Sequence, residues 1–322
     1  MQWLIYGANG YTGELIAREA VRRGHHPILA GRDAAAIEAL ARELGCEARV
    51  FALDGIDLAG VSLVLHCAGP FIRTSKPMVD ACLAAGAHYL DITGEIAVFE
   101  AIAARNDEAA ARGVTLLPGA GFDIVPTDCL AAMLTERLPG ATELSLAFYM
   151  KGGAVSRGTA RTMLESIGEG GAIRRDGKIV RVPTAWDTRT IGFSCGERTA
   201  MTIPWGDVST AFRTTGIPNI RVYTAAHPKT IARLRRFRWL LPLIGWKPIR
   251  RLLQRFAAPR GGPDARTRTT ARTYVWGEVS NGTESMSMTM STPEGYAFTA
   301  VSAVNAAERV GQRPRGGAFT PA

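Results

Sequence analysis

The fold of this 322-residue chain is decided by the stretch Gly7-Ala8-Asn9-Gly10-Tyr11-Thr12-Gly13. It follows the apolar run Trp3–Tyr6, which predicts a strand, and it opens a helical pattern near Glu14–Arg23. Glycine is needed here because the chain turns sharply, because backbone must approach a pyrophosphate, and because the helix must pack closely on the sheet. The N-terminus of that helix would offer N–H groups and a positive dipole end to phosphates. We therefore expect this stretch, called the glycine loop below, to bind a dinucleotide.

Outward from the glycine loop, short apolar runs alternate with helical patterns through residues 1–125. The predicted strands are Trp3–Tyr6, Pro27–Ala30, Ala48–Ala52, Ser62–Cys67, Tyr89–Ile92 and Val114–Leu117. The predicted helices are Glu14–Arg23, Ala34–Leu44, Pro77–Ala85 and Ile96–Arg112, closed by Gly24, Gly45, Gly86 and Gly113. This alternation predicts an α/β fold, an N-terminal Rossmann-type parallel sheet covered by helices.

Strands that are no longer separated by helices predict a second, α+β domain. Its predicted helices are Thr127–Leu138 and Thr159–Ile167, and its predicted strands are Glu143–Met150, Lys178–Val182, Arg198–Ile203 and Arg221–Ala225. Asn281-Gly282 predicts a two-residue turn between strands Thr270–Ser280 and Thr283–Thr292. We expect a dinucleotide-binding domain at residues 1–125, a substrate domain at 126–294, and a last helix and tail at 295–322.

The end of the second strand indicates which cofactor binds. A carboxylate there would bind the ribose 2′-hydroxyl of NAD, whereas an arginine suits the 2′-phosphate of NADP. Arg32 stands at this position and favours NADP(H), while the next residue, Asp33, is expected to cap the following helix. After the fourth strand, Ala68-Gly69-Pro70 should line the route to the nicotinamide, because ligands of this fold bind beyond the carboxyl ends of the strands.

The residues that would assist the chemistry are less distinctive. No tyrosine is followed four residues later by lysine, so the acid of short-chain dehydrogenases is absent. Asp123 and Arg157 are the candidates for polar groups that face the substrate, with a helix cap and a surface cation as the alternatives. His66 and Cys67 lie in an apolar strand and are expected in the core. The Gly-x-Ser-x-Gly match at 192–196 precedes a strand rather than the helix that a hydrolase serine requires.

The formal net charge of +9 is divided unevenly along the chain. Residues 1–150 hold 11 basic and 18 acidic residues, whereas residues 151–322 hold 27 and 11. Ten basic residues and no acidic one lie between Lys229 and Arg260. This segment could pack on its own domain with its arginines in water, or contact a membrane surface or an acyl-carrier partner. We do not expect a nucleic-acid partner.

Other features of the sequence exclude several classes of protein. The longest run without a charged residue, Leu58–Ile72, is short of the ~20 apolar residues that cross a bilayer. The N-terminus lacks the basic flank of a signal peptide, and the five cysteines form no Cys-x-x-Cys pair, so neither a disulfide framework nor a metal site is expected. A cytoplasmic location is expected, with peripheral contact with a membrane left open.

Several of these motifs together resemble the saccharopine dehydrogenase-like oxidoreductases, a family that includes trans-acting enoyl reductases. The resemblance rests on Tyr6–Gly13, Ala68–Phe71, His88–Glu95, Gly119–Asp128 and Ser156–Thr159. It implies a Rossmann domain, a second α/β domain, an NADP(H)-type cofactor and a C-terminal helix that returns to the first domain. The fold hosts several chemistries, so the resemblance leaves the substrate open.

The sequence thus favours an NADP-dependent oxidoreductase that acts on a small, hydrophobic substrate, and it leaves open whether that substrate is of the acyl type. Two alternatives remain: an NADP(H)-binding sensor without turnover, because no general acid is evident, and a membrane-associated interaction protein, because of the basic segment.

Overall fold

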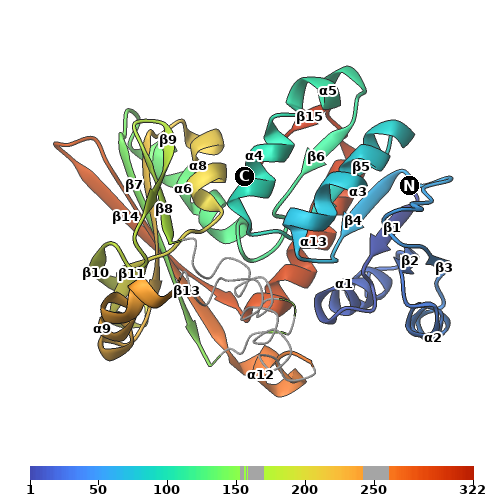
Figure 1. The fold of residues 1–322 in the computed structure, drawn as a ribbon, viewed down its shortest axis with the longest axis horizontal. Helices are drawn as coiled ribbons and strands as arrows, with labels where there is room; N and C mark the ends of the chain where they lie inside the picture. Colours follow the sequence, from blue (N-terminus) through green and yellow to red (C-terminus); the bar gives the residue numbers. More distant parts are fainter. Residues whose placement is uncertain (153–155, 157, 159–169, 242–260) are drawn as a thin grey trace. The chain divides into compact units, whose positions relative to one another are not determined.

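The computed structural model describes residues 1–152, 156, 158, 170–241 and 261–322 (Figure 1). These residues form two compact units. The first unit joins Met1–Val125 to Tyr296–Pro321, and the second contains Pro126–Gly295 and Ala322. Arg157, the predicted helix Thr159–Ile167 and residues 242–260 of the basic segment lie outside the described residues. No helix in the described ranges is both long and apolar enough to span a membrane.

The first unit is built on a seven-stranded parallel sheet in the order β15-β6-β5-β4-β1-β2-β3 (Figure 1). Its strands are β1 (Trp3–Tyr6), β2 (Ile28–Gly31), β3 (Ala48–Val50), β4 (Leu63–His66), β5 (His88–Asp91), β6 (Thr115–Leu117) and β15 (Gly317–Ala318). Because β1 lies between β2 and β4, the strand order reverses next to the glycine loop, which is where ligands of open α/β sheets bind. The predicted Rossmann-type parallel sheet is confirmed.

Helices cover both faces of this sheet. Their bounds are α1 Tyr11–Arg22, α2 Ala34–Leu44, α3 Phe71–Ala85, α4 Ile96–Ala103, α5 Asn106–Ala111 and α13 Gly295–Gln312. One core joins Ile5 and Leu65 of the strands to α1, α2 and α13, and the other joins Leu4 and Val64 to α3 and α4. Strands buried on both faces need apolar residues at nearly every position, which explains the continuous apolar runs in the sequence.

Two predicted helices differ from the observed ones. Ile96–Arg112 is divided into α4 and α5, because the chain makes a tight turn at Ala104–Arg105. The helix predicted from Pro77 begins six residues earlier, at Phe71, and Pro77 lies inside it. Proline is most common in the first turn of a helix, and that preference led to the wrong start.

The second unit contains a mixed sheet in the order β10-β11-β12-β7-β13-β14, with β8 and β9 attached to β12 (Figure 1). The strands are β7 (Glu143–Lys151), β8 (Gly171–Arg175), β9 (Lys178–Val182), β10 (Thr188–Phe193), β11 (Gly196–Thr202), β12 (Asn219–Ala225), β13 (Arg272–Ser280) and β14 (Ser285–Pro293). The helices are α6 (Val125–Arg137), α8 (Asp207–Thr215), α9 (Pro228–Phe237), the short 3₁₀ helix η1 (Arg238–Leu240) and α12 (Ala265–Thr270). The predicted α+β character is confirmed, although β8, β10 and α8 were not predicted.

The turn between β13 and β14 differs from the prediction. Ser280 pairs with Ser285, so four residues rather than two form the turn. Only Gly282 among them has a positive φ, +92°, whereas a two-residue turn of the predicted kind needs two. The side chain of Asn281 explains the difference, because its Oδ1 accepts hydrogen bonds from the backbone N–H groups of Thr283 and Glu284 at 3.0 and 2.8 Å.

Candidate cofactor and active site

The glycine loop connects β1 to α1 and is tightly packed. Gly7 has φ +83°, and a Cβ there would lie 2.9 Å from the backbone nitrogen of Ala68. A Cβ on Gly13 would lie 2.2 Å from the carbonyl oxygen of Gly7. Real Cβ atoms essentially never approach backbone so closely, so both positions require glycine. This close packing brings the start of α1 against the loop that follows β4.

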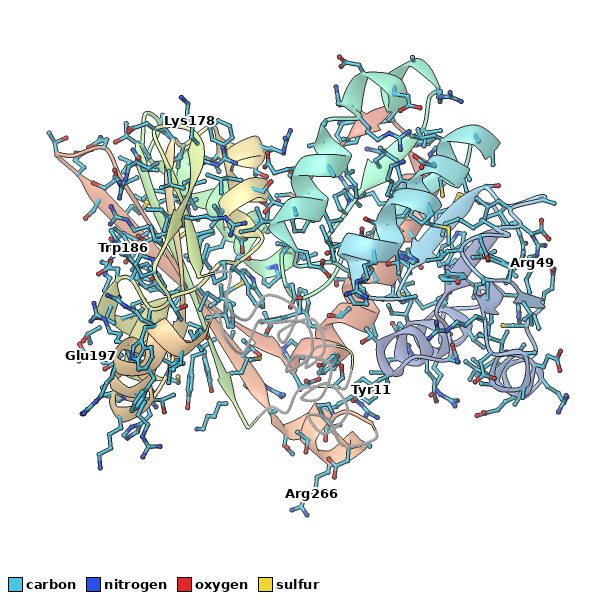
Figure 2. All side chains as sticks on the ribbon, in the orientation of Figure 1. Tyr11, Arg49, Lys178, Trp186, Glu197 and Arg266 are labelled. Atoms are coloured by element: carbon cyan, nitrogen blue, oxygen red, sulfur yellow. The ribbon has the colours of Figure 1, made fainter. Side chains whose placement is uncertain are left out.

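The N-terminus of α1 is suited to an anion. Its N-cap, Gly10, is extended and provides no side-chain hydrogen bond to the first turn, which begins with Tyr11 and Thr12 (Figure 2). By contrast, Asp33 caps α2, accepting from Ala36 N at 3.2 Å, which confirms its predicted role. A helix N-terminus whose N-cap residue is a glycine, reached over glycine backbone, fits the diphosphate of a dinucleotide.

Arg32 follows directly on β2, next to the glycine loop. A Cβ on Gly31 would lie 3.2 Å from Oδ1 of Asn9, so the side chain of Asn9 lies against the end of this strand. Arg32 itself is exposed, and it takes part in no ion pair within the described part of the chain. Its side chain is therefore exposed at the position where the sequence predicts a bound 2′-phosphate.

The loop after β4 is held by a chain of hydrogen bonds. Thr74 Oγ1 donates to the carbonyl oxygen of Ala68 at 2.7 Å, and His66 Nε2 lies 2.9 Å from the same hydroxyl. Burial lowers the pKa of His66 to about 3, so the ring is neutral and its Nε2–H donates to Thr74. His66 is a fully buried core residue, as predicted, and it positions Ala68-Gly69-Pro70.

Asp91 joins the loops after β5 and β6. Its Oδ1 accepts from the backbone N–H groups of Thr93 and Gly119 at 3.0 and 2.9 Å, and its Oδ2 accepts from the hydroxyl of Tyr89 at 2.8 Å. Burial raises the pKa of this fully buried carboxyl to about 6, although the three hydrogen bonds favour the charged form. Asp91 therefore has a structural role, because it holds the two loops together.

Glu95 links the loop after β5 to the start of α3. Its two carboxylate oxygens each accept a backbone N–H at 2.8 Å, from Phe71 and from Ile72. The carboxylate of Glu95 therefore caps the helix that precedes it in the chain, α3. These two hydrogen bonds also explain why α3 begins at Phe71.

The structure describes one of the two candidate catalytic residues, Asp123. Asp123 lies in the loop after β6, half-buried, where a Cβ on Gly94 would be 2.8 Å from its Oδ2. Burial raises the pKa of Asp123 to about 6, so that it takes up a proton at a higher pH than an exposed aspartate does. The loop that contains Asp123 follows β6, and the glycine loop follows β1. Because these strands are parallel, both loops lie at the same edge of the sheet. Arg157 is not among the described residues.

Helix α13 supplies supporting residues that the sequence did not reveal. Thr299 Oγ1 accepts from Phe122 N at 2.9 Å, and Ser302 Oγ donates to the carbonyl oxygen of Ala120 at 2.8 Å. The rings of Tyr11 and Tyr296 meet edge to face, 5.0 Å apart. The only sequence signal was a Thr and a Ser on the apolar face of the last helix. These contacts hold α13 against the loop that contains Asp123 and against the glycine loop.

The Gly-x-Ser-x-Gly match lies elsewhere and in a different setting. Phe193 of β10 pairs with Gly196 of β11, so Ser194 and Cys195 form the turn of a hairpin. A nucleophile elbow requires a strand followed by a helix. The geometry therefore excludes this serine as a hydrolase nucleophile of that type.

Comparisons with known proteins agree with this site. Residues 3–117 match the family of the saccharopine dehydrogenase NADP binding domain. A Mycobacterium tuberculosis protein named as a trans-acting enoyl reductase is 33% identical over 181 residues, which are 50% of this chain and 43% of the relative. A saccharopine dehydrogenase-like oxidoreductase of Rattus norvegicus is 26% identical over 206 residues, 54% of this chain and 48% of its own. The matched region thus spans about half the length of these relatives or less.

Solved structures show the same fold along the whole chain. Apo saccharopine dehydrogenase (L-Glu forming) of Saccharomyces cerevisiae has a TM-score of 0.64 at 12% identity, over 99% of this chain and 94% of the other. An engineered D-amino acid dehydrogenase bound to NADP+ has a TM-score of 0.50 at 15% identity, over 100% and 93%. The resemblance to saccharopine dehydrogenase-like oxidoreductases and the NADP type of the N-terminal domain are confirmed.

Proposed function

We propose that the chain is an NADP-dependent oxidoreductase that acts on a small hydrophobic, acyl-type substrate. The match of residues 3–117 to the saccharopine dehydrogenase NADP binding domain supports the cofactor and the reaction class. The observation that carries this proposal is the tight passage of the glycine loop over Gly7 and Gly13 into α1, whose N-cap is the glycine Gly10, with the exposed Arg32 at the end of the adjacent strand. The names of the enoyl reductase relatives support an acyl-type substrate.

The proposed roles of the described residues follow from their positions, and the role proposed for Arg157 rests on the sequence alone. When bound, NADPH supplies the hydride, so the protein needs to provide only binding, orientation and a proton. The glycine loop would hold the diphosphate, Arg32 the 2′-phosphate, and Ala68-Gly69-Pro70 the nicotinamide side of the cofactor. Asp123 would hold the proton for the reduced substrate, and Arg157 would bind a polar group of the substrate.

Replacing Arg32 with alanine is expected to weaken NADPH binding about 10- to 100-fold and to leave NADH binding nearly unchanged. A hydrogen bond to a charged group contributes about 1.5–3 kcal/mol, and only NADPH has the 2′-phosphate. Titrations of both cofactors followed by nicotinamide fluorescence measure the two affinities. Arg42→Ala, an exposed arginine in the last turn of α2, is the matched control. An unchanged preference for NADPH in Arg32→Ala would refute the role given to Arg32.

Replacing Asp123 with asparagine is expected to lower kcat about 10²- to 10⁴-fold, the usual contribution of a general acid. Because the pKa of Asp123 is about 6, the protonated form declines as the pH rises through that value, so wild-type reduction should slow above pH about 6. The measurement is kcat against pH for the wild type, Asp123→Asn and the control Asp54→Asn at an exposed loop position. If Asp123→Asn keeps both the rate and the pH dependence of the wild type, Asp123 is not the acid.

A partner for the basic segment 229–260 is also proposed. The five cations of its described part could bring the enzyme to a substrate held at a membrane surface or on an acidic acyl carrier.

A further inference from the structure

The described half of the basic segment forms an exposed structure on the second unit. Helix α9 is capped by His227, whose Nδ1 accepts from Lys229 N at 3.2 Å, and η1 follows α9 directly. Ile231 is the one buried residue of α9, and Arg235 donates to the carbonyl oxygen of Trp186 at 3.2 Å. These contacts fix one side of the helix, while nitrogen-tipped side chains project from it into solvent (Figure 2).

The exposed side carries only positive charge. Between Lys229 and Leu241 there are five cations and no acidic residue. They are Lys229, Arg233, Arg235, Arg236 and Arg238. None of the five takes part in an ion pair within the described part of the chain. The positive charges of such a cluster repel one another, and the free energy of the cluster falls when it binds a negatively charged surface.

Two large aromatic side chains protrude among these cations. Trp239 is 68% exposed, more than any other large apolar side chain in the described ranges, and Phe237 is 48% exposed. The guanidinium of Arg236 lies 5.8 Å from the centre of the Phe237 ring. Exposed tryptophan costs free energy in water, and at a bilayer surface this side chain settles at the level of the headgroups.

We propose that this surface, made of the five cations with Phe237 and Trp239 and called the α9 patch, binds a bilayer rich in anionic lipid. Both an acidic protein and a membrane offer negative charge to the arginines. A bilayer also offers an apolar phase beneath that charge, into which single protruding rings can partition. Membrane binding by the α9 patch goes beyond the proposed reaction and is independent of cofactor binding.

The test is sedimentation of the full chain with vesicles of equal phosphatidylglycerol and phosphatidylcholine, and with vesicles of phosphatidylcholine alone. The wild type should bind the anionic vesicles far better. The variant Arg233→Gln/Arg236→Gln/Arg238→Gln should bind them on the order of 100-fold more weakly, because each cation near an anionic surface contributes several-fold. This variant leaves Arg235 unchanged, because Arg235 fixes the helix by its hydrogen bond to Trp186. The control Arg42→Gln/Arg266→Gln/Arg309→Gln removes the same charge from exposed positions elsewhere and should bind like the wild type.

A second measurement separates a bilayer from an acidic protein partner. If Trp239 enters the headgroup region, brominated lipid should quench part of the tryptophan emission, and Trp239→Ser should remove that part. The proposal is overturned by absence of binding to anionic vesicles or by equal losses in the two triple variants, which would reflect total charge. It is also overturned by binding without quenching at Trp239, which would show attraction by charge alone, with no ring entering the bilayer. NADPH titration of the same variants should be unchanged, so failure of the α9 patch and failure of the cofactor site are distinguishable.

Discussion

Gly13→Ala is expected to weaken NADPH binding by at least about 100-fold while the protein still folds. The added Cβ would lie 2.2 Å from the carbonyl oxygen of Gly7, so α1 must move away from the glycine loop. Such overpacking typically costs about 1–3 kcal/mol of stability, which most domains survive. Cofactor binding suffers more, because the N–H groups at the start of α1 must aim at the diphosphate within a few tenths of an ångström. Fluorescence titration measures the affinity, and thermal unfolding reports the stability.

A matched control for Gly13→Ala exists in the same unit. Gly55 has ordinary negative φ and nothing within 4 Å of a Cβ, so Gly55→Ala should leave both cofactor affinity and stability nearly unchanged. If Gly13→Ala binds NADPH as the wild type does, the diphosphate does not rest on the N-terminus of α1. The proposed function would then lose its main support.

Asp91→Ala should lower the free energy of unfolding by about 3–5 kcal/mol. It leaves the N–H groups of Thr93 and Gly119 and the hydroxyl of Tyr89 without their acceptor in the core, and each unsatisfied group costs about 1–3 kcal/mol. Asp91→Asn should lose much less, because an amide oxygen can still accept from both N–H groups. Chemical denaturation of the two variants measures the difference. Equal losses would contradict the hydrogen-bonding role.

The same carboxyl should make stability depend on pH. Its folded-state pKa of about 6 is raised above the ordinary value of 3.8, so the folded state binds a proton more tightly than the unfolded state. The wild type should therefore gain stability as the pH falls from 7 to 4, and lose it again as the pH rises through about 6. The gain attributable to Asp91 is about 2–3 kcal/mol, and the difference between the wild type and Asp91→Asn isolates it from Asp123. A pH dependence that is the same in both proteins would show that Asp91 does not titrate in this range.

The sequence was sufficient for the parallel sheet and for the position of the glycine loop. Strands buried on both faces must be apolar along their length, so β1, β2, β4, β5 and β6 are each visible in a few consecutive residues, whereas the two-residue strand β15 was not predicted. The helix ends at Gly24, Gly45, Gly86 and Gly113 were also predictable, because their positive φ is a local requirement that glycine meets. The positive φ of Gly7 and the contact of Gly13 with the carbonyl oxygen of Gly7 are local requirements of the same kind, whereas the close approach of Gly7 to Ala68 belongs to the tertiary structure.

What surrounds the glycine loop was decided by the tertiary structure. Glu95 begins α3 by binding Phe71, 24 residues earlier, and Thr299 holds Phe122, 177 residues away. The burial of Asp91, which gives it a supporting role, likewise depends on loops from two different strands. Periodicity and spacing report what a residue requires of its near neighbours in the chain. They carry no information on which distant donor will meet a given carboxylate, and it is those long-range hydrogen bonds that shape the candidate site.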